Sequence, residues 1–426
     1  MDVISLRRDL HQHPEVGFTE FRTASIVVET LQSFGFQVSY GADAIDAETR
    51  GGVPSEKEIQ QAYQRALDAG ANPDIIKAME GGLTAVVGIL KGNRPGPTIA
   101  FRFDMDALPI EESMDSDHIP QVEGFRAKYD GIMHACAHDG HTAIGLGLAE
   151  KMSHGDFAGT LKLIFQPAEE GGRGGFAMMT KGVVDDVDQI FCLHLGLDVP
   201  FGEIAAGSTG WLCSKKFSVQ YHGVPSHAGG APEKGRNALV GAATALLNIH
   251  ALPRHSSCET RLNVGVLEGG TTPNIIPHFA KMLIEARSSS DQVLKDLEKR
   301  VLNIISHSAE MHELQYDVEI IGESRTIHCD DELIVKVLEE AQQTEGFTSF
   351  KERINSGVGE DASWLIHRVQ ENGGKGTYMM IGTEISAPHH HQKFDINEKI
   401  LPMSVKLLEN VANRVLVGSE FQVITK

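Results

Sequence analysis

The strongest constraint on the fold of this chain is a rhythm of short apolar runs that alternate with helical segments. Four runs have the length and composition of buried strands, and they cover residues 83–92, 97–109, 159–170 and 187–196. The segment 142–152 among them has helical spacing. Apolar runs separated by helices are typical of βαβ units that build a largely parallel sheet. The sequence therefore predicts an α/β domain with a mixed, largely parallel sheet flanked by helices.

The alternation of strands and helices changes near residue 210, and the first pattern returns near residue 330. Between these points the expected order is strand 215–223, helix 237–252, strand 260–270, strand 277–288, helix 290–312 and strand 315–322. This βαββαβ order is the ferredoxin-like pattern of a compact α+β unit. A helix at 331–344 and a strand at 376–382 then resume the first pattern. We expect a discontinuous domain, residues 1–210 and 325–426, with a smaller domain inserted at 211–324.

The N-terminal part of the chain has mostly helical character. Apolar residues recur at roughly helical spacing through the first 35 residues, from Leu6 and Leu10 to Leu31. A Gly-rich stretch follows, and residues 55–70 then form a short amphipathic pattern that Gly70 ends.

The composition excludes several classes of partner. There are 38 basic and 58 acidic residues, for a net charge of −20, and such a chain repels the phosphate backbone of nucleic acids. No apolar run approaches the roughly 18 residues that a membrane span requires. The N-terminus lacks the apolar core of a secretory signal, and five scattered cysteines form no disulfide framework. We therefore expect a cytoplasmic protein with reduced thiols, without nucleic-acid or membrane partners.

One short segment, MHACAHDGHTA at 133–143, concentrates groups that bind metals. Cys136 and His138 are two residues apart, so in an extended segment both side chains would point to the same side. A thiolate and an imidazole on one face suit zinc or a similar divalent ion. Asp139 then fits the N-cap of a helix that starts at His141.

Acids and histidines also follow the predicted strands where they end. These residues are Asp104 and Asp106, Glu169 and Glu170, His194, and the run His389, His390 and His391. Open α/β sheets bind their ligands at the carboxyl ends of strands. The convergence of several such ends with the 134–141 cluster predicts a metal site there.

The pair Glu169–Glu170 suggests a division of labour. Adjacent residues of an extended chain face opposite ways, so one carboxylate can bind a metal while its neighbour faces the attacking water. A metal lowers the pKa of that water towards neutrality, and a nearby glutamate accepts its proton.

The ordered motifs resemble those of the di-metal aminoacylase and carboxypeptidase family, and within it the amidohydrolase branch of hippurate and auxin-conjugate hydrolases. They include RRDLHQHPEVGFTEFRT, RFDMDALPI, HACAHDGHT, FQPAEEGG, PSHAGGAPEKGRNAL, GGTTPNIIP and HHHQKFDINE, and they span nearly the whole chain. One departure is Ala137, where the branch usually has glycine; this change removes no ligand.

The resemblance implies two divalent ions per chain, zinc or manganese, and assigns their ligands. It places Cys136, His138, Glu170, His194 and one C-terminal histidine around the ions, with Glu169 as general base and acid. The family has its last ligand four residues before a phenylalanine, which favours His390 ahead of Phe394, with His389 and His391 as rivals. Asp104 and Asp106 match a strand end whose carboxylates would orient ligand imidazoles.

In the inserted domain the resemblance implies a lid and dimerisation role. His227, Asn274 and Arg287 match the positions that hold substrate, and the guanidinium of Arg287 suits an α-carboxylate. His227 would reach the active site of a partner chain and steady the reacting amide. The assembly would be a homodimer, or a heterodimer with a paralogous subunit.

The implied activity is hydrolysis of the amide bond of a small N-acyl or N-aroyl amino acid. The motif HACAHD and the extra helical segment near residues 45–80 resemble the branch members that split p-aminobenzoyl-glutamate into p-aminobenzoate and glutamate. Two alternatives stay open. One is another acylated amino acid such as a hippurate-like compound, and the other is a non-catalytic partner of a paralogous hydrolase.

Overall fold

The structure is a computed structural model, and it describes residues 1–417. This part of the chain divides into two compact units. The first unit comprises residues 1–209, 327–356 and 361–417, and the second comprises residues 210–326 and 357–360. The structure does not test the roles predicted for these two parts of the chain. The catalytic role of the first and the lid or dimerisation role of the second remain predictions.

The first unit is built on an eight-stranded sheet with the order β1-β2-β4-β3-β5-β12-β6-β11. Its strands are β1 (Gln37–Tyr40), β2 (Val86–Lys91), β3 (Arg94–Asp104), β4 (Ala158–Gln166), β5 (Gln189–Leu195), β6 (Glu203–Thr209), β11 (Ser349–Asn355) and β12 (Lys375–Ile381). The four neighbours β4, β3, β5 and β12 pair in parallel, as do β6 and β11. The pairs β1–β2, β2–β4 and β6–β12 are antiparallel.

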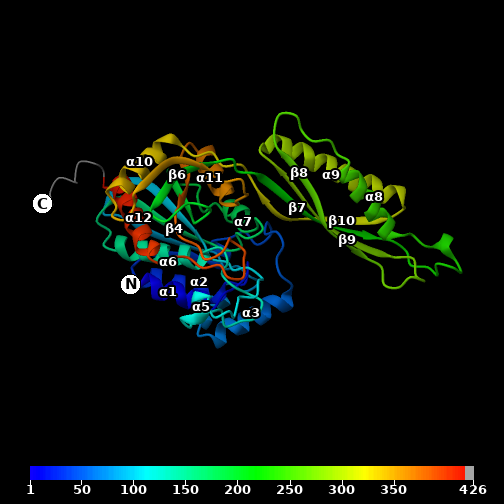
Figure 1. The fold of residues 1–426 in the computed structure, drawn as a ribbon, viewed down its shortest axis with the longest axis horizontal. Coiled ribbons are helices and arrows are strands. Elements are labelled where there is room, and N and C mark those ends of the chain that lie inside the picture. Colours follow the sequence, from blue (N-terminus) through cyan, green and yellow to red (C-terminus); the bar gives the residue numbers. More distant parts are fainter. Residues whose placement is uncertain (418–426) are drawn as a thin grey trace. The chain divides into compact units, whose positions relative to one another are not determined.

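Helices flank this sheet (Figure 1). They are α1 (Val3–Gln12), α2 (Phe21–Ser33), α3 (Glu56–Asp68), α4 (Pro73–Lys77), α5 (Ile119–Val122), α6 (His138–Met152), α7 (Gly175–Thr180), α10 (Asp331–Gln343), α11 (Ala362–Glu371) and α12 (Ile400–Leu416). Helices α6 and α12 pack on β3 and β4 with α1 against α6, while α11 packs on β5 and β12. The mixed, largely parallel sheet flanked by helices confirms the predicted fold class.

The N-terminal 35 residues are two helices rather than one continuous helical stretch. Residues 13–20 separate α1 from α2, and Phe18 within this break has a left-handed backbone (φ 63°). Asp2 caps α1 by accepting hydrogen bonds from the amides of Ile4 and Ser5. The predicted helix at 55–70 is α3, where Ser55 and Glu58 form a capping box.

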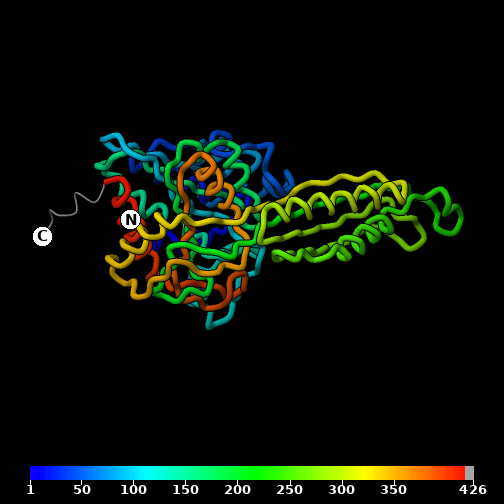
Figure 2. Tube along the Cα trace, turned by 90° about the horizontal axis from the view of Figure 1, so that it is seen from above, coloured from blue at the N-terminus to red at the C-terminus, as the bar shows by residue number. Residues whose placement is uncertain are grey.

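The second unit has the order β7 (Cys213–His222), α8 (Ala238–His250), β8 (Thr260–Gly269), β9 (Phe279–Ser288), α9 (Asp291–Met311), β10 (Gln315–Ser324). Its sheet is antiparallel with the order β10-β7-β9-β8, and both helices pack on it (Figure 2). The core between sheet and helices includes Phe217, Tyr221, Ile284 and Ile305. This is the βαββαβ arrangement that the sequence predicted.

Three strands of the first unit were not predicted from the sequence: β1, β6 and β11. β6, with the sequence EIAAGST, has few of the branched or aromatic residues that mark a strand. Its pairing with β12 and β11 decides its structure. No helix among residues 1–417 is long and apolar enough to cross a membrane.

Candidate metal centre

Parallel pairing brings the predicted strand ends to one edge of the sheet. Strands β4, β3, β5 and β12 are adjacent and run in the same direction, so their carboxyl ends lie side by side. Asp104 is the last residue of β3, and His194 is the second last residue of β5. The turn with Glu169 and Glu170 follows β4, and the histidine run 389–391 follows β12.

The segment around Cys136 is not extended, and Asp139 is not a helix cap. Helix α6 begins at His138, and its N-cap is Ala137 with a left-handed backbone (φ 66°). Asp139 therefore lies in the first turn of α6 and contacts the Nε of Arg7 at 2.7 Å. The expectation failed because a left-handed alanine turns the chain sharply at this point, which lets the helix start three residues earlier.

Cys136, His138 and Glu170 come together despite this difference. One ligand atom of each lies within 4.8 Å of the others. Nδ1 of His138 lies 2.9 Å from the backbone oxygen of Asp106, which turns its Nε2 to the other side. That Nε2 is buried and has no partner with normal hydrogen-bond geometry among the described residues.

A second group shares the same thiol. Cys136, His194 and His389 also have ligand atoms within 4.8 Å of one another. The Sγ of Cys136 lies 3.4 Å from Nε2 of His194, whose Nδ1 contacts the backbone oxygen of Leu195 at 2.7 Å. The thiol thus lies between an imidazole from α6 and an imidazole from β5. A third group, Asp104 with His138 and His141, lies next to the first.

The three C-terminal histidines have different surroundings. Nε2 of His390 lies 3.2 Å from Oε1 of Glu170, and its backbone is left-handed (φ 64°). Nε2 of His389 contacts the backbone oxygen of Leu195 at 3.2 Å. Nδ1 of His391 accepts from the amide of Lys393 at 3.1 Å, within its own loop. His390 and His389 therefore both lie next to predicted ligands, whereas the Nδ1 of His391 is used within its own loop.

Glu169 and Glu170 lie in a turn, not in extended chain as the sequence suggested. Ala168 before them has a left-handed backbone (φ 51°). Asp106 fixes the turn, because its Oδ1 accepts from the amide of Glu169 and its Oδ2 from the amide of Glu170, both at 3.0 Å. The two side chains still have different neighbours: Glu170 approaches His390, and Oε2 of Glu169 lies 3.9 Å from Nε2 of His138.

Burial dominates the pKa of two candidate ligands, Cys136 and His194. It raises the pKa of the Cys136 thiol well above its usual value, and the charge of Glu170 adds to this effect. Burial also lowers the pKa of His194 well below its usual value, with the neighbouring imidazoles acting in the same direction. Burial alone would raise the pKa of Asp104, but His138, His141 and an arginine outweigh it and hold the pKa well below its usual value.

These donors fit a divalent ion. The buried thiol of Cys136 ionises only beside a cation, and the imidazole of His194 is neutral. Together with the buried Nε2 of His138 they form a suitable ligand set. Sulfur, nitrogen and carboxylate oxygen in one group suit zinc or a similar ion. The two groups that share Cys136 offer room for two ions.

The predicted substrate-holding residues lie in the second unit, and they do not all lie together. His227 pairs with Ile275 next to Asn274, whose backbone oxygen accepts from the amide of Ala228 at 3.0 Å. Arg287 lies near the other end of β9, and its guanidinium contacts Glu285 at 2.9 Å. Nδ1 of His227 accepts from the amides of Gly229 and Gly230.

A buried charge network behind the metal-binding segment was not predicted. Arg7 and His11 of α1 both contact Oδ2 of Asp139, at 2.7 and 2.8 Å, and Nε2 of His11 contacts Glu112 at 2.9 Å. Burial and Arg7 oppose the charge on His11, but the two carboxylates outweigh them and raise its pKa to about 9. The sequence did contain an indication of this network, because Arg7 and His11 lie on the same helix face as Val3 and Leu10. Charged side chains on an apolar face need buried partners.

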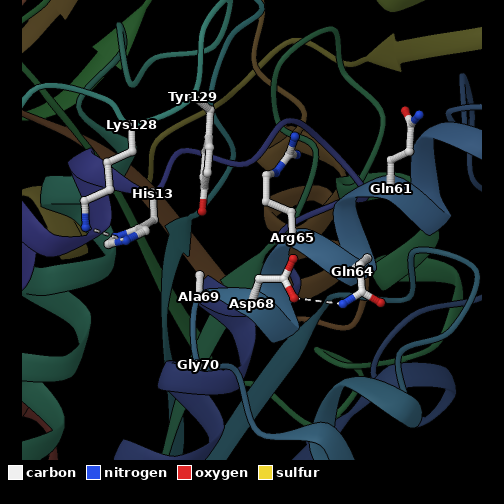
Figure 3. Close-up of a pocket in the computed structure, with 9 residues that line it drawn as sticks. All are labelled: His13, Gln61, Gln64, Arg65, Asp68, Ala69, Gly70, Lys128 and Tyr129. Carbon is white, nitrogen blue, oxygen red and sulfur yellow. Dashed lines mark hydrogen bonds between the residues drawn. The ribbon is translucent and has the colours of Figure 1, made fainter.

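A hollow of about 800 Å3 lies beside α3 (Figure 3). It is lined by His13, Gln61, Gln64, Arg65, Asp68, Ala69, Gly70, Lys128 and Tyr129. Arg65 and Lys128 lie on either side of Tyr129, and the guanidinium carbon of Arg65 is 4.9 Å from the ring centroid. None of the predicted site residues lines this hollow.

The parallel strand ends, the shared thiol and the adjacent glutamates form a candidate metal centre. The model of "Peptidase family M20/M25/M40" matches residues 100–414, and the chain belongs to this family. Its members act on amide bonds, and this chain is an M20 amidohydrolase.

Relatives with similar sequences cover nearly the whole chain. The indole-3-acetyl-aspartic acid hydrolase of Enterobacter agglomerans is 42% identical over 405 residues, which are 94% of this chain and 93% of the relative. One of the subunits of p-aminobenzoyl-glutamate hydrolase from Escherichia coli (strain K12) is 40% identical over 409 residues, which are 95% of this chain and 94% of the relative.

Solved structures with a similar fold agree with the family assignment. The aminobenzoyl-glutamate utilization protein from Klebsiella pneumoniae matches with a TM-score of 0.84 and 38% identity over 96% of this chain and 94% of that chain. A Bacillus subtilis protein described as a dinuclear metal-binding peptidase of the M20 family matches with a TM-score of 0.64 and 23% identity over 97% of this chain and 98% of that chain. This second likeness supports the fold.

Proposed function

We propose that this chain hydrolyses the amide bond between an aromatic acyl group and an acidic amino acid, with p-aminobenzoyl-glutamate as the first candidate. The products would be p-aminobenzoate and glutamate. The observation that carries the proposal is the group Cys136, His138 and Glu170 with Glu169 beside it. The two relatives add the substrate class, because both of their names join an aromatic acid to aspartate or glutamate.

Two divalent ions, zinc or manganese, would be held by Cys136, His138, Glu170, His194 and His390. Cys136 would be a ligand in this set, because it belongs to two groups of neighbouring donors, one with His138 and Glu170 and the other with His194 and His389. When bound, the ions polarise the amide carbonyl and lower the pKa of a nearby water molecule. Asp106 would orient the ligand imidazole of His138, because it contacts Nδ1 of that ring. Asp104 contacts Nδ1 of His141, which is not one of the proposed ligands.

Glu169 is the group that moves the proton. Its Oε2 lies on the side of His138 Nε2, at 3.9 Å, and it does not belong to the Cys136 groups. Its carboxylate accepts a proton from the attacking water and returns this proton to the nitrogen of the leaving amino acid. The fixed turn between Asp106 and Glu169 keeps the carboxylate at this place during both transfers.

The hydrogen bonds of His227 support a role in oxyanion stabilisation. Its Nδ1 accepts two amide hydrogen bonds, so the proton of a neutral ring is on Nε2, which can donate to a developing oxyanion. Arg287 would bind the α-carboxylate of the substrate in exchange for its contact with Glu285.

The distance between these residues favours two chains at one site. Within one chain β9, about 30 Å long at strand rise, separates His227 and Asn274 from Arg287. An N-acyl amino acid is much shorter, so it cannot contact both ends of β9 in one chain. We therefore propose that His227 and Asn274 act in the site of a partner, either a second copy or a paralogous subunit.

The test is a hydrolysis screen of the isolated chain with zinc, manganese or chelator. The substrates are p-aminobenzoyl-glutamate, indole-3-acetyl-aspartate, hippurate and an N-acetyl amino acid, and amino acid release is measured. We expect turnover of the aromatic conjugates of acidic amino acids, and none with chelator. Activity confined to hippurate or to acetyl amino acids would contradict the substrate class. A chain that binds about two ions but needs a paralogous subunit for any turnover would contradict activity of this chain alone.

The shared site has a test of its own. Chains with His227→Ala and chains with Glu169→Gln should each be nearly inactive. Mixed dimers should recover part of the activity, because one of their two sites receives both intact side chains. Mixed dimers without activity would show that His227 does not act in the partner's site.

A further inference from the structure

The turn that carries Glu169 and Glu170 is held by a second buried carboxylate. Ala168 donates its amide hydrogen to Oε1 of Glu20 at 2.8 Å, while the next two amides donate to Asp106. Three consecutive amides therefore point at two carboxylates. The hydrogen bonds favour the left-handed backbone of Ala168, which costs energy for a residue other than glycine.

Glu20 is placed for this contact rather than for capping its own helix. It is the N-cap residue of α2, yet its side chain makes no capping bond. Glu15 takes that role, because its two carboxylate oxygens accept from the amides of Arg22 and Thr23, both at 2.8 Å. The side chain of Glu20 instead enters the core, where it is fully buried and accepts from the hydroxyl of Thr84 at 2.6 Å.

Nothing in the local sequence of α2 requires a buried carboxylate at this place. Burying a carboxyl group is unfavourable unless hydrogen bonds compensate, and a hydrophobic residue at this position would pack without that cost. One of its two compensating contacts is the amide of the turn that precedes the predicted base and ligand. The contact therefore links the N-terminus of α2 directly to the candidate centre.

We propose that Glu20 is a positioning residue that fixes the turn at Ala168 and thereby places Glu169 and Glu170. It acts as a hydrogen-bond acceptor and touches neither metal nor substrate. Loss of the acceptor lets the left-handed alanine relax, which moves both glutamates together. Both metal affinity and turnover then fall, because one glutamate is a proposed ligand and the other the proposed base. The effect on turnover rests on the proposed function.

Two variants distinguish the hydrogen-bond acceptor of Glu20 from the volume of its side chain. Glu20→Met keeps the volume and removes the acceptor, whereas Glu20→Gln keeps an acceptor oxygen for Ala168. The matched control is Glu15→Met, because Glu15 is also buried and also accepts two bonds, but from α2 and not from the turn. Should Glu20→Met not fold, Glu20→Asp replaces it, since its shorter carboxylate cannot reach Ala168 in the same position.

The experiment measures zinc affinity of the full chain by competition with a chromogenic chelator, together with kcat, KM and thermal unfolding. Glu20→Met should bind zinc about 10- to 100-fold more weakly and lose a similar factor in kcat, as expected for partners behind a metal ligand. Glu20→Gln should restore both. Glu15→Met should lower the unfolding temperature and leave zinc affinity and kcat within about threefold, since a bond lost away from the turn costs stability alone.

Two results would overturn the proposal. One is unchanged zinc affinity in a folded Glu20→Met or Glu20→Asp chain. The other is equal loss of zinc affinity in Glu15→Met, which would assign the effect to general destabilisation. A wild-type chain that binds zinc but hydrolyses none of the amides would refute the proposed function, and the zinc comparison would still decide the role of Glu20.

Discussion

Replacement of Asp106 by asparagine tests how the centre is held together. The carboxylate accepts from the amides of Glu169 and Glu170, both at 3.0 Å, and its Oδ1 lies 3.3 Å from Nδ1 of His138. In Asp106→Asn one oxygen becomes an NH2 group, so one buried amide faces another donor and loses its acceptor. The remaining bond loses the assistance of the charge.

The expected magnitude follows from these contacts. A buried donor without an acceptor costs about 1–3 kcal/mol, which corresponds to roughly 5- to 150-fold in an equilibrium constant. Carboxylates that support metal ligands typically contribute about 10- to 100-fold to metal affinity, so we expect zinc affinity to fall about 10- to 100-fold, with kcat falling at least as much, because the turn holds a proposed ligand and the proposed base. The free energy of unfolding of the metal-free chain should fall by about 1–3 kcal/mol.

The assay is competition for zinc with a chromogenic chelator, combined with urea unfolding after metal removal. Asp330→Asn is the control, because Asp330 accepts from the amide of Gly376 and from Gln370 away from the centre. It should leave zinc affinity unchanged. Zinc affinity within about twofold of wild type in Asp106→Asn would refute this reasoning.

Four further outcomes are expected. Glu169→Gln should keep about two ions per chain and lose about 100-fold or more in turnover, as expected for the loss of a general base. Glu170→Gln should instead bind less metal. Equal metal content and turnover in the two variants would contradict the separate roles of base and ligand. Cys136→Ser should bind zinc more weakly, because a hydroxyl replaces a thiolate poorly, and full metal content with a normal rate would make it a packing residue. Among the C-terminal histidines, His390→Ala should abolish metal-dependent turnover, and a larger loss at either neighbouring histidine would move the ligand there. The fold raises the pKa of His11 from 6.5 to about 9, so protonated His11 stabilises the fold fully below about pH 6.5, and this stabilisation is lost as the pH rises to 9. Urea unfolding of the metal-free chain should show this loss in wild type and not in His11→Gln.

The place of the site could be predicted from the sequence because its residues follow apolar strands. Asp104 and His194 lie at strand ends in the structure, and the adjacent parallel strands bring those ends together. The alternation of strands and helices also predicted both sheets, without the strands β1, β6 and β11 of the first. These features depend on the hydrophobic pattern, which is visible in a single sequence.

The local shape of the site could not be predicted in this way. Two alanines, Ala137 and Ala168, adopt left-handed backbones that their own preferences disfavour. The bond from Ala168 to Glu20 joins residues 148 positions apart, so no local pattern reveals it. The same holds for Arg7 and His11, whose partner Asp139 lies far along the chain.

The most direct test of metal-dependent hydrolysis measures glutamate release from p-aminobenzoyl-glutamate by the purified chain, reconstituted with about two equivalents of zinc or manganese. We expect turnover that chelation abolishes and that metal restores. A Glu169→Gln chain should carry the same metal with turnover lower by about 100-fold or more. Turnover that persists in the chelated chain, or that Glu169→Gln leaves intact, would contradict a metal-dependent hydrolase with Glu169 as its base.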